Sequence, residues 1–178
     1  YKLHGKKRMH ERPIGDLVDS LNSIGANIKY LENIGYPPIN ILKSSVNNYD
    51  IKINGSISSQ FLTSLLISSP IIAEKKSLQI EVLGDLISKP YVDITINIMK
   101  KFGVDVLLKE KNIFLIQAGQ KYKSPGSIVV EGDASTGSYF LAAAAISGQK
   151  IRIKGIGKKS IQGDIEFINI LGKMGANI

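Results

Sequence analysis

The sequence predicts an α/β fold built from repeated βαβαββ-type units, and three observations support this prediction. A segment with apolar residues at helical spacing, closed by Gly-Ala or Gly-Val, recurs at 13–28, 90–106 and 163–178. A second pattern begins at Gly55 and again at Gly132, where glycine precedes small hydroxyl residues, Phe-Leu and an apolar helix. Segments that alternate apolar and polar residues follow these helices, and such alternation is typical of a half-buried strand. Helices and strands in this order pack as helices over sheets.

Each of the three similar segments contains its own stop signal. Glycine is the usual residue after the last helical turn, because it adopts a left-handed conformation without penalty. The three glycines are Gly25, Gly103 and Gly175. Acids recur early in the same segments, where they favour the helix dipole and are interpreted as structural; they are Asp16, Asp93 and Asp164. The apolar residues after each glycine are predicted to start a strand.

The strands of the predicted units lie between these helices. Alternating residues predict strands at 77–85 and 150–157, and a further strand pair is predicted at 104–117, with another strand at 127–131. The stretch 121–135 contains Ser-Pro-Gly and then Gly-Asp, which makes it the best candidate for a domain junction.

The composition narrows the possible functions. The chain has 178 residues, 23 Lys+Arg against 15 Asp+Glu and no cysteine. The charge of +8 suits an anionic partner, and the lack of cysteine excludes disulfides, thiolate metal sites and a cysteine nucleophile. No membrane-length apolar run or signal peptide is seen, so a cytoplasmic protein is expected. Because the first residue is Tyr and both ends interrupt a pattern, we expect a fragment of a longer protein.

The first group of candidate binding residues lies where a helix begins after Gly55. Ser58, Ser59 and Gln60 precede an apolar run. Serine is a preferred N-cap, and the free N–H groups at a helix start bind anions readily. Hydroxyls, an amide and backbone donors in one turn suit a phosphate monoester, although a purely structural cap gives the same pattern.

Two further helix starts carry polar residues beside a proline. Arg12 precedes the proline of the first repeat, and Ser88 and Tyr91 flank that of the second. Proline is common in a first helical turn, so these residues are expected at helix N-termini that face one opening if the repeats pack side by side. An arginine there can grip a phosphate or carboxylate. The alternatives are a surface pair of Arg12 with Glu11, a simple cap at Ser88 and a core position for Tyr91.

Five blocks in this order resemble the 5-enolpyruvylshikimate-3-phosphate synthase family over essentially the whole chain. They are RMHERPIGDLVDSL, GSISSQFLTSLL, GDLISKPYVDIT, EGDASTGSYFLAAAA and IQGD. The resemblance implies a two-domain enolpyruvyl transferase fold, an inside-out α/β barrel, that is incomplete here at both ends. Residues 1–130 would belong to the first domain and residues 131–178 would start the second, with Val130–Asp133 as one of two crossovers.

The resemblance also implies an activity. The family transfers the enolpyruvyl group of phosphoenolpyruvate to the 5-hydroxyl of shikimate 3-phosphate, through a tetrahedral adduct, and releases phosphate. This step belongs to the shikimate pathway of chorismate and aromatic amino acid biosynthesis. It needs no metal and no cofactor. The expected partners are these two small molecules, with no nucleic acid and no membrane, and the expected oligomeric state is a monomer.

Site residues follow from the same resemblance, motif by motif. Ser58, Ser59 and Ser88 look like ligands of the phosphoryl group of shikimate 3-phosphate, and Tyr91 like a residue lining that site. Gln60 is similar to a glutamine that touches both substrates.

Arg12 resembles the arginine that holds phosphoenolpyruvate. The family's catalytic acid-base residues have no match, so no catalytic residue is expected in this chain, and residues 1–178 alone are expected to be inactive.

Three other readings compete with this one. UDP-N-acetylglucosamine enolpyruvyl transferase usually carries a cysteine in the loop before its Arg-Pro, and this chain has none. A basic nucleic-acid-binding α/β module fits the charge, but the few aromatic residues are not interleaved with basic ones on a strand. A purely structural α/β repeat protein would show no preference for phosphate.

Overall fold

The computed structural model describes residues 1–56, 59–110, 112–157 and 159–178. The chain divides into two compact units, Tyr1–Ser124 (unit 1) and Pro125–Ile178 (unit 2). The division falls inside the stretch 121–135, where Ser-Pro-Gly marks a turn.

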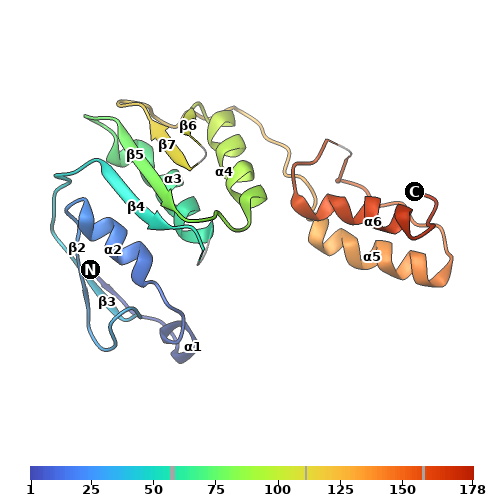
Figure 1. Ribbon diagram of the computed structural model, residues 1–178, viewed down its shortest axis with the longest axis horizontal. Helices are drawn as coiled ribbons and strands as arrows, with labels where there is room; N and C mark the ends of the chain where they lie inside the picture. Colours follow the sequence, from blue (N-terminus) through green and yellow to red (C-terminus); the bar gives the residue numbers. More distant parts are fainter. Residues whose placement is uncertain (57–58, 111, 158) are drawn as a thin grey trace. The chain divides into compact units, whose positions relative to one another are not determined.

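Unit 1 contains two sheets with helices packed against them (Figure 1). The antiparallel sheet of order β1-β3-β2 consists of β1 (Lys2–Leu3), β2 (Asn27–Tyr30) and β3 (Ile39–Leu42). The sheet of order β4-β5-β7-β6 consists of β4 (Asp50–Asn54), β5 (Leu78–Leu83), β6 (Val106–Glu110) and β7 (Ile113–Ile116). The helices are α1 (Lys7–His10), α2 (Gly15–Ser23), α3 (Ser59–Ile72) and α4 (Lys89–Lys101).

The parallel pair β4–β5 determines where the helices of unit 1 begin. The two strands run side by side with Ile51 opposite Ile80 and Ile53 opposite Val82. Parallel neighbours need a crossover connection, which is usually a helix, and here α3 supplies it. Because α3 leaves β4 and α4 leaves β5, both helices begin at the carboxyl-terminal edge of this sheet.

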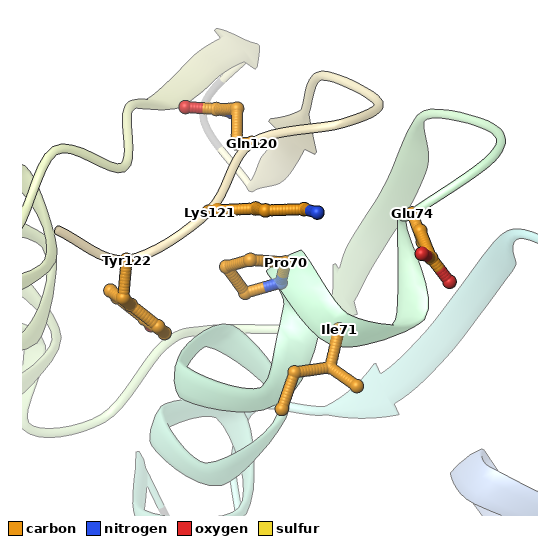
Figure 2. A pocket seen from close by; sticks show the side chains of 6 residues that line it. All are labelled: Pro70, Ile71, Glu74, Gln120, Lys121 and Tyr122. Carbon is orange, nitrogen blue, oxygen red and sulfur yellow. The ribbon is translucent and has the colours of Figure 1, made fainter.

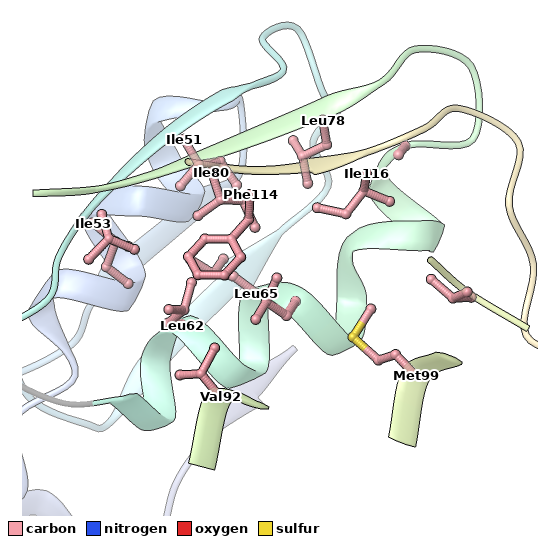
Figure 3. Close-up of a cluster of buried hydrophobic side chains, with 14 of the residues drawn as sticks. Ile51, Ile53, Leu62, Leu65, Leu78, Ile80, Val92, Met99, Phe114 and Ile116 are labelled. Carbon is pink, nitrogen blue, oxygen red and sulfur yellow. The ribbon is translucent and has the colours of Figure 1, made fainter. Parts of the chain in front are cut away.

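One hydrophobic core joins this sheet to α3 and α4. Alternate residues of β4, β5 and β7 point to the same face, as the period of a strand requires. Figure 3 shows the side chains of Leu62 and Leu65 on α3 packed against Phe114 of the sheet. Val92 and Met99 of α4 close the core. Burial of these apolar side chains is the main source of the unit's stability.

The structure confirms the predicted helix stops and the predicted hairpin. The three glycines after the repeated helices all have positive φ angles: +104° at Gly25, +81° at Gly103 and +97° at Gly175. The strand pair predicted at 104–117 is the antiparallel hairpin β6–β7. The strand predicted at 77–85 is β5. These features were predictable because each follows from local sequence.

The secondary-structure elements described in unit 2 are helices. It contains α5 (Ala134–Ser147), the 3₁₀ helix η1 (Gly163–Glu166) and α6 (Phe167–Lys173). The helix expected after Gly132 is therefore present, and the helix expected within 163–178 is formed by η1 and α6. Asp133 caps α5, because its carboxylate accepts a hydrogen bond from the Ser135 N–H at 3.1 Å.

The strands predicted at 127–131 and 150–157 are wrong for the residues that the structure describes. Neither segment forms a sheet, although the Gly132 N–H donates to the Gly155 carbonyl at 2.8 Å. A strand is stabilised by a ladder of such bonds to its neighbours, and one bond does not make a ladder. The side chains of Val129 and Val130 are accordingly exposed.

Candidate functional site

The starts of α3 and α4 are held together by backbone hydrogen bonds between the loops that precede them. The Gly55 N–H donates to the Leu83 carbonyl at 3.0 Å, and the Ile87 N–H donates to the Gly55 carbonyl at 3.3 Å. The loop after β4 is thus joined to the loop after β5. A similar bond, from Gly132 to Gly155, recurs in unit 2 at the second copy of the glycine-hydroxyl pattern.

Position 55 has no room for any side chain, so only glycine fits there. A Cβ atom at this position would lie 2.9 Å from the Asp85 carbonyl oxygen and still closer to Cγ1 of Val82. Real Cβ atoms essentially never approach other atoms so closely. The glycine that begins the predicted turn therefore permits the close approach of the two loops.

The first helix start contains two of the predicted site residues. Ser59 is the first residue of α3 and is half-buried, and the exposed Gln60 follows it. Ser58 lies outside the described residues. Just upstream, the Asn54 side chain accepts hydrogen bonds from the Ser56 N–H at 3.0 Å and the Ser56 hydroxyl at 2.7 Å. Asn54 thus orders the entry to α3, a role not predicted from the sequence.

The second helix start carries Ser88 in an unusual conformation. Ser88 has φ 56° and ψ 39°, and it is the one non-glycine residue with positive φ among the residues described. Its hydroxyl makes no capping hydrogen bond to the described part of α4, so the reading of Ser88 as a simple cap is wrong. Left-handed conformations of non-glycine residues cost free energy and cluster at functional sites.

Tyr91 lies in the first turn of α4, three residues after Ser88. Its side chain is 58% exposed, so the alternative of a core position is wrong. Its N–H donates to the Ser88 carbonyl at 3.1 Å. The neighbouring Lys89 is engaged in an ion pair with Asp93, with Nζ and Oδ2 3.1 Å apart. Ser88 and Tyr91 therefore share one exposed turn at the edge where α3 also begins.

A hydroxyl pair links α3 to α4 inside the helix–helix contact. The Oγ1 atoms of Thr63 and Thr95 are 3.3 Å apart, and the Thr95 hydroxyl donates to the Tyr91 carbonyl at 2.9 Å. Sequence reasoning missed this contact, because two threonines 32 residues apart give no local signal. Thr63 lies about one helical turn after the first residue of α3, and Thr95 lies nearly two turns after the first residue of α4.

Arg12 lies on the loop before α2. At the far end of that helix, the Asn47 N–H donates to the Ile24 carbonyl, while the Ser20 hydroxyl contacts the Lys52 carbonyl at 3.0 Å. The helix therefore runs antiparallel to β4, and its N-terminus points toward the edge where α3 and α4 begin. No hydrogen bond or ion pair joins Arg12 to those two turns within the described residues.

The alternative pairing of Arg12 with Glu11 is also wrong. Glu11 bonds to Arg8 instead, with Nη1 and Oε2 2.8 Å apart. The Arg12 guanidinium makes no hydrogen bond or ion pair with any residue that the structure describes, and the residue is exposed. The N–H donors of the Arg12 guanidinium therefore face solvent.

A separate groove of about 300 Å³ lies at the other end of α3 (Figure 2). It is lined by Pro70, Ile71, Glu74, Gln120, Lys121 and Tyr122. The Tyr122 hydroxyl donates to the Ile67 carbonyl at 2.8 Å, and burial raises the pKa of this tyrosine. Pro70 is 11 residues from Ser59, which corresponds to about 16 Å along a helix. The groove therefore contains none of the predicted site residues.

The described ranges contain neither a metal-ligand cluster nor a membrane-spanning helix. There, no three or more His, Asp or Glu side chains gather in a way that could hold a metal ion. None of the helices in those ranges has both the length and the apolar character needed to cross a membrane.

The described edge carries hydroxyl, amide and phenol groups at two helix starts. Helix N-termini offer unpaired N–H groups and the positive end of the helix dipole. Such an arrangement can bind a phosphoryl or carboxylate group without a metal.

Comparison with known proteins places the chain in a family. The family model described as EPSP synthase (3-phosphoshikimate 1-carboxyvinyltransferase) matches residues 1–178. The chain is 52% identical over 178 residues to the 3-phosphoshikimate 1-carboxyvinyltransferase of Janthinobacterium sp. (strain Marseille), covering all of this chain and 40% of the relative. It is 58% identical over 176 residues to the enzyme of that name in Buchnera aphidicola subsp. Acyrthosiphon pisum (strain 5A), covering 99% of this chain and 40% of the relative.

Solved structures show the same fold. An EPSP synthase from Acinetobacter baumannii matches with a TM-score of 0.73 and 20% identity, covering 99% of this chain and 38% of that chain. The chain thus spans about 40% of the length of the curated relatives it matches. It belongs to the EPSP synthase (3-phosphoshikimate 1-carboxyvinyltransferase) family.

Proposed function

We propose that this chain forms part of an enzyme that transfers the enolpyruvyl group of phosphoenolpyruvate to the 5-hydroxyl of shikimate 3-phosphate and releases phosphate. The observation that carries the proposal is the convergence of two helix starts at one sheet edge, where the loops of Gly55 and Ile87 are bonded to each other. Family membership supports the choice of reaction. The step belongs to the shikimate pathway of chorismate and aromatic amino acid biosynthesis.

The shikimate 3-phosphate site is assigned to the starts of α3 and α4. Ser59 and Ser88 donate their hydroxyls to the phosphoryl group, together with Ser58, and the helix dipoles favour its negative charge. Gln60 contacts both substrates, and Tyr91 lines the site. The left-handed conformation of Ser88 supports this role, since it keeps the hydroxyl out of a capping bond within the described helix.

Phosphoenolpyruvate is assigned to Arg12. A guanidinium recognises a carboxylate or phosphate through two parallel N–H bonds, and the arginine side chain is exposed beyond the N-terminus of α2. The direction of α2 along β4 places this terminus toward the same edge as the two serine-bearing turns.

The remaining assignments concern the whole enzyme. Residues 1–130 belong to the first domain and residues 131–178 start the second. The enzyme acts as a cytoplasmic monomer on its two small-molecule substrates, without a cofactor, metal, nucleic acid or membrane. Residues 1–178 hold substrate contacts but no catalytic acid or base, so by themselves they do not turn over substrate.

The test separates the two substrates by substitution in the complete enzyme. Arg12→Ala should raise the KM for phosphoenolpyruvate more than that for shikimate 3-phosphate, and Ser88→Ala should do the opposite. Each loses a charge-assisted hydrogen bond, which costs about 1.5–3 kcal/mol, or about ten- to a hundredfold in affinity.

Matched control positions for both substitutions are available elsewhere in unit 1. Arg8→Ala removes an arginine that is already paired with Glu11. Ser64→Ala removes a hydroxyl whose bond stays within α3, to the Phe61 carbonyl. Both controls should leave the two KM values unchanged. Equal effects of Arg12→Ala and Ser88→Ala on both substrates would refute the assignment.

A further inference from the structure

The hydroxyl contact between α3 and α4 has a definite direction. Thr95 has one hydroxyl proton, and its geometry directs that proton to the Tyr91 carbonyl at 2.9 Å. A threonine hydroxyl has only one proton to donate but can accept further bonds. In the 3.3 Å contact, Thr63 must therefore donate to Thr95. The bonds form one chain from the Thr63 hydroxyl through the Thr95 hydroxyl to the Tyr91 carbonyl.

The hydroxyls of Thr63 and Thr95 lie in a partly buried contact between the two helices. Thr95 is 9% exposed, and Thr63 is half-buried between the helices. Hydrogen bonds in a low-dielectric interior strengthen one another and fix geometry. Leaving one of these groups without its partner would carry a desolvation cost.

The hydrogen-bonded chain of hydroxyls connects the two helix starts, so its role extends beyond helix packing. It starts one turn after Ser59 and ends at the backbone of Tyr91, so it spans both halves of the proposed phosphate site. The bonded loops of Gly55 fix the two helices outside their starts. The hydroxyls fix them inside their starts. The two helix N-termini are thus held on both sides.

We propose that Thr63 and Thr95 are positioning residues that set the spacing between the α3 and α4 halves of the shikimate 3-phosphate site. This inference rests on the proposed function. Neither side chain touches substrate. Each acts through the turn that it holds, because a phosphoryl group bridging two helix starts is gripped fully only when the starts lie at the right separation.

The experiment replaces the hydroxyls by methyl groups in the complete enzyme. Thr95→Val breaks both bonds and should raise the KM for shikimate 3-phosphate about five- to tenfold. Thr63→Val breaks one bond and should raise it about two- to fourfold. The KM for phosphoenolpyruvate should change less than twofold in both variants. Thr95→Ser retains the hydroxyl and should restore the KM to within twofold of the unaltered enzyme.

Ser69→Ala is the matched control. Ser69 is fully buried on α3, and among the described residues its hydroxyl bonds only to the Leu66 carbonyl of the same helix, at 2.6 Å. This variant loses a buried hydroxyl without loosening the two helix starts, so its KM values should not change. Thermal unfolding of every variant identifies loss of the fold. If Thr95→Val does not fold, the half-buried Thr63→Val provides the same comparison.

The outcomes distinguish the two proposals. The positioning role would be overturned if the threonine variants raised the KM values for both substrates equally. It would also be overturned if Ser69→Ala raised the KM for shikimate 3-phosphate as much as they do. Either result would leave the two threonines a structural role only. If Thr95→Val and Thr63→Val leave the KM for shikimate 3-phosphate unchanged while Ser88→Ala raises it, the positioning role is overturned and the proposed function stands. Failure of the unaltered enzyme to bind shikimate 3-phosphate in a calorimetric titration would overturn both proposals.

Discussion

Asp133 shows how a single carboxylate secures the start of a helix. It accepts hydrogen bonds from the Thr136 hydroxyl and the Ser135 N–H, so it caps the first turn of α5. The Thr136 hydroxyl is the main cause that lowers the pKa of Asp133 below the ordinary value of 3.8, and the backbone bonds add to it. These bonds favour the charged form.

The lowered pKa predicts an acid-sensitive cap. A carboxyl group whose pKa is depressed in the folded state contributes stability above its unfolded pKa, and that contribution is lost as the pH falls through the folded pKa. Helicity of α5 should therefore be constant above about pH 4 and decrease below it. Circular dichroism at 222 nm, followed from pH 6 to pH 2, measures this loss.

Asp133→Asn provides the control for that titration. Asparagine is also a good N-cap but does not titrate in this range. The difference between the two titration curves isolates the contribution of Asp133 from those of Asp164 and the other acids. Superimposable curves would contradict the assignment of the acid sensitivity to this cap.

At the scale of elements, Gly25 joins the end of α2 to the start of β2 and is sensitive to any side chain. It has φ +104°, and a Cβ there would lie 2.9 Å from Oδ1 of Asn47 and closer still to the Ser45 carbonyl oxygen. Gly35 has φ +88°, but apart from its own chain neighbours no atom of the described residues lies within 4 Å of its Cβ position. A side chain at Gly35 would therefore meet backbone strain alone, whereas a side chain at Gly25 would meet both backbone strain and a steric clash.

Alanine substitutions should show that difference. Gly35→Ala introduces the strain of a left-handed residue, about 1–2 kcal/mol. Gly25→Ala adds an overpacking cost of about 1–3 kcal/mol and should destabilise clearly more. Urea unfolding of the two variants, with the same m-value as the unaltered chain, gives both free energies. Equal destabilisation would mean that the loop of Ser45 moves aside without cost.

Local patterns predicted most elements, because their causes lie within a few residues. The glycine stops at Gly25 and Gly103 follow from backbone freedom, and β5 follows from alternation. The segment 150–157 has the same alternation but forms no strand among the described residues, since strand formation depends on partners as well as pattern. The repeated sequence pattern therefore predicted the helices of unit 2 correctly but not its strands.

The position of the candidate residues at helix starts was predictable from the sequence, but their geometry was not. Ser59 and Ser88 were located at helix starts because serine and proline have local roles there. The left-handed φ of Ser88 and the bond from Thr63 to Thr95 depend on contacts between segments about 30 residues apart. No local pattern in one sequence contains that information.

At the scale of the whole molecule, the main core is confined to unit 1. Every residue of the buried cluster, from Ile24 to Ile116, lies within Tyr1–Ser124. The buried apolar residues of unit 2 within the described ranges are Ala134 and Leu171. Because burial of apolar surface is the dominant stabilising term, cooperative unfolding of this chain should report mainly on unit 1.

A chain of residues 1–124 should consequently fold alone. We expect it to unfold in urea as a single cooperative transition, with the same midpoint as the main transition of residues 1–178, followed by circular dichroism. Leu65→Ala, at a fully buried position of α3, should cost about 2–5 kcal/mol in either chain. The two costs should be equal, because no described residue of unit 2 belongs to the cluster around Leu65. A lower midpoint for residues 1–124, or a smaller cost of Leu65→Ala there, would show that unit 2 contributes to the stability of unit 1.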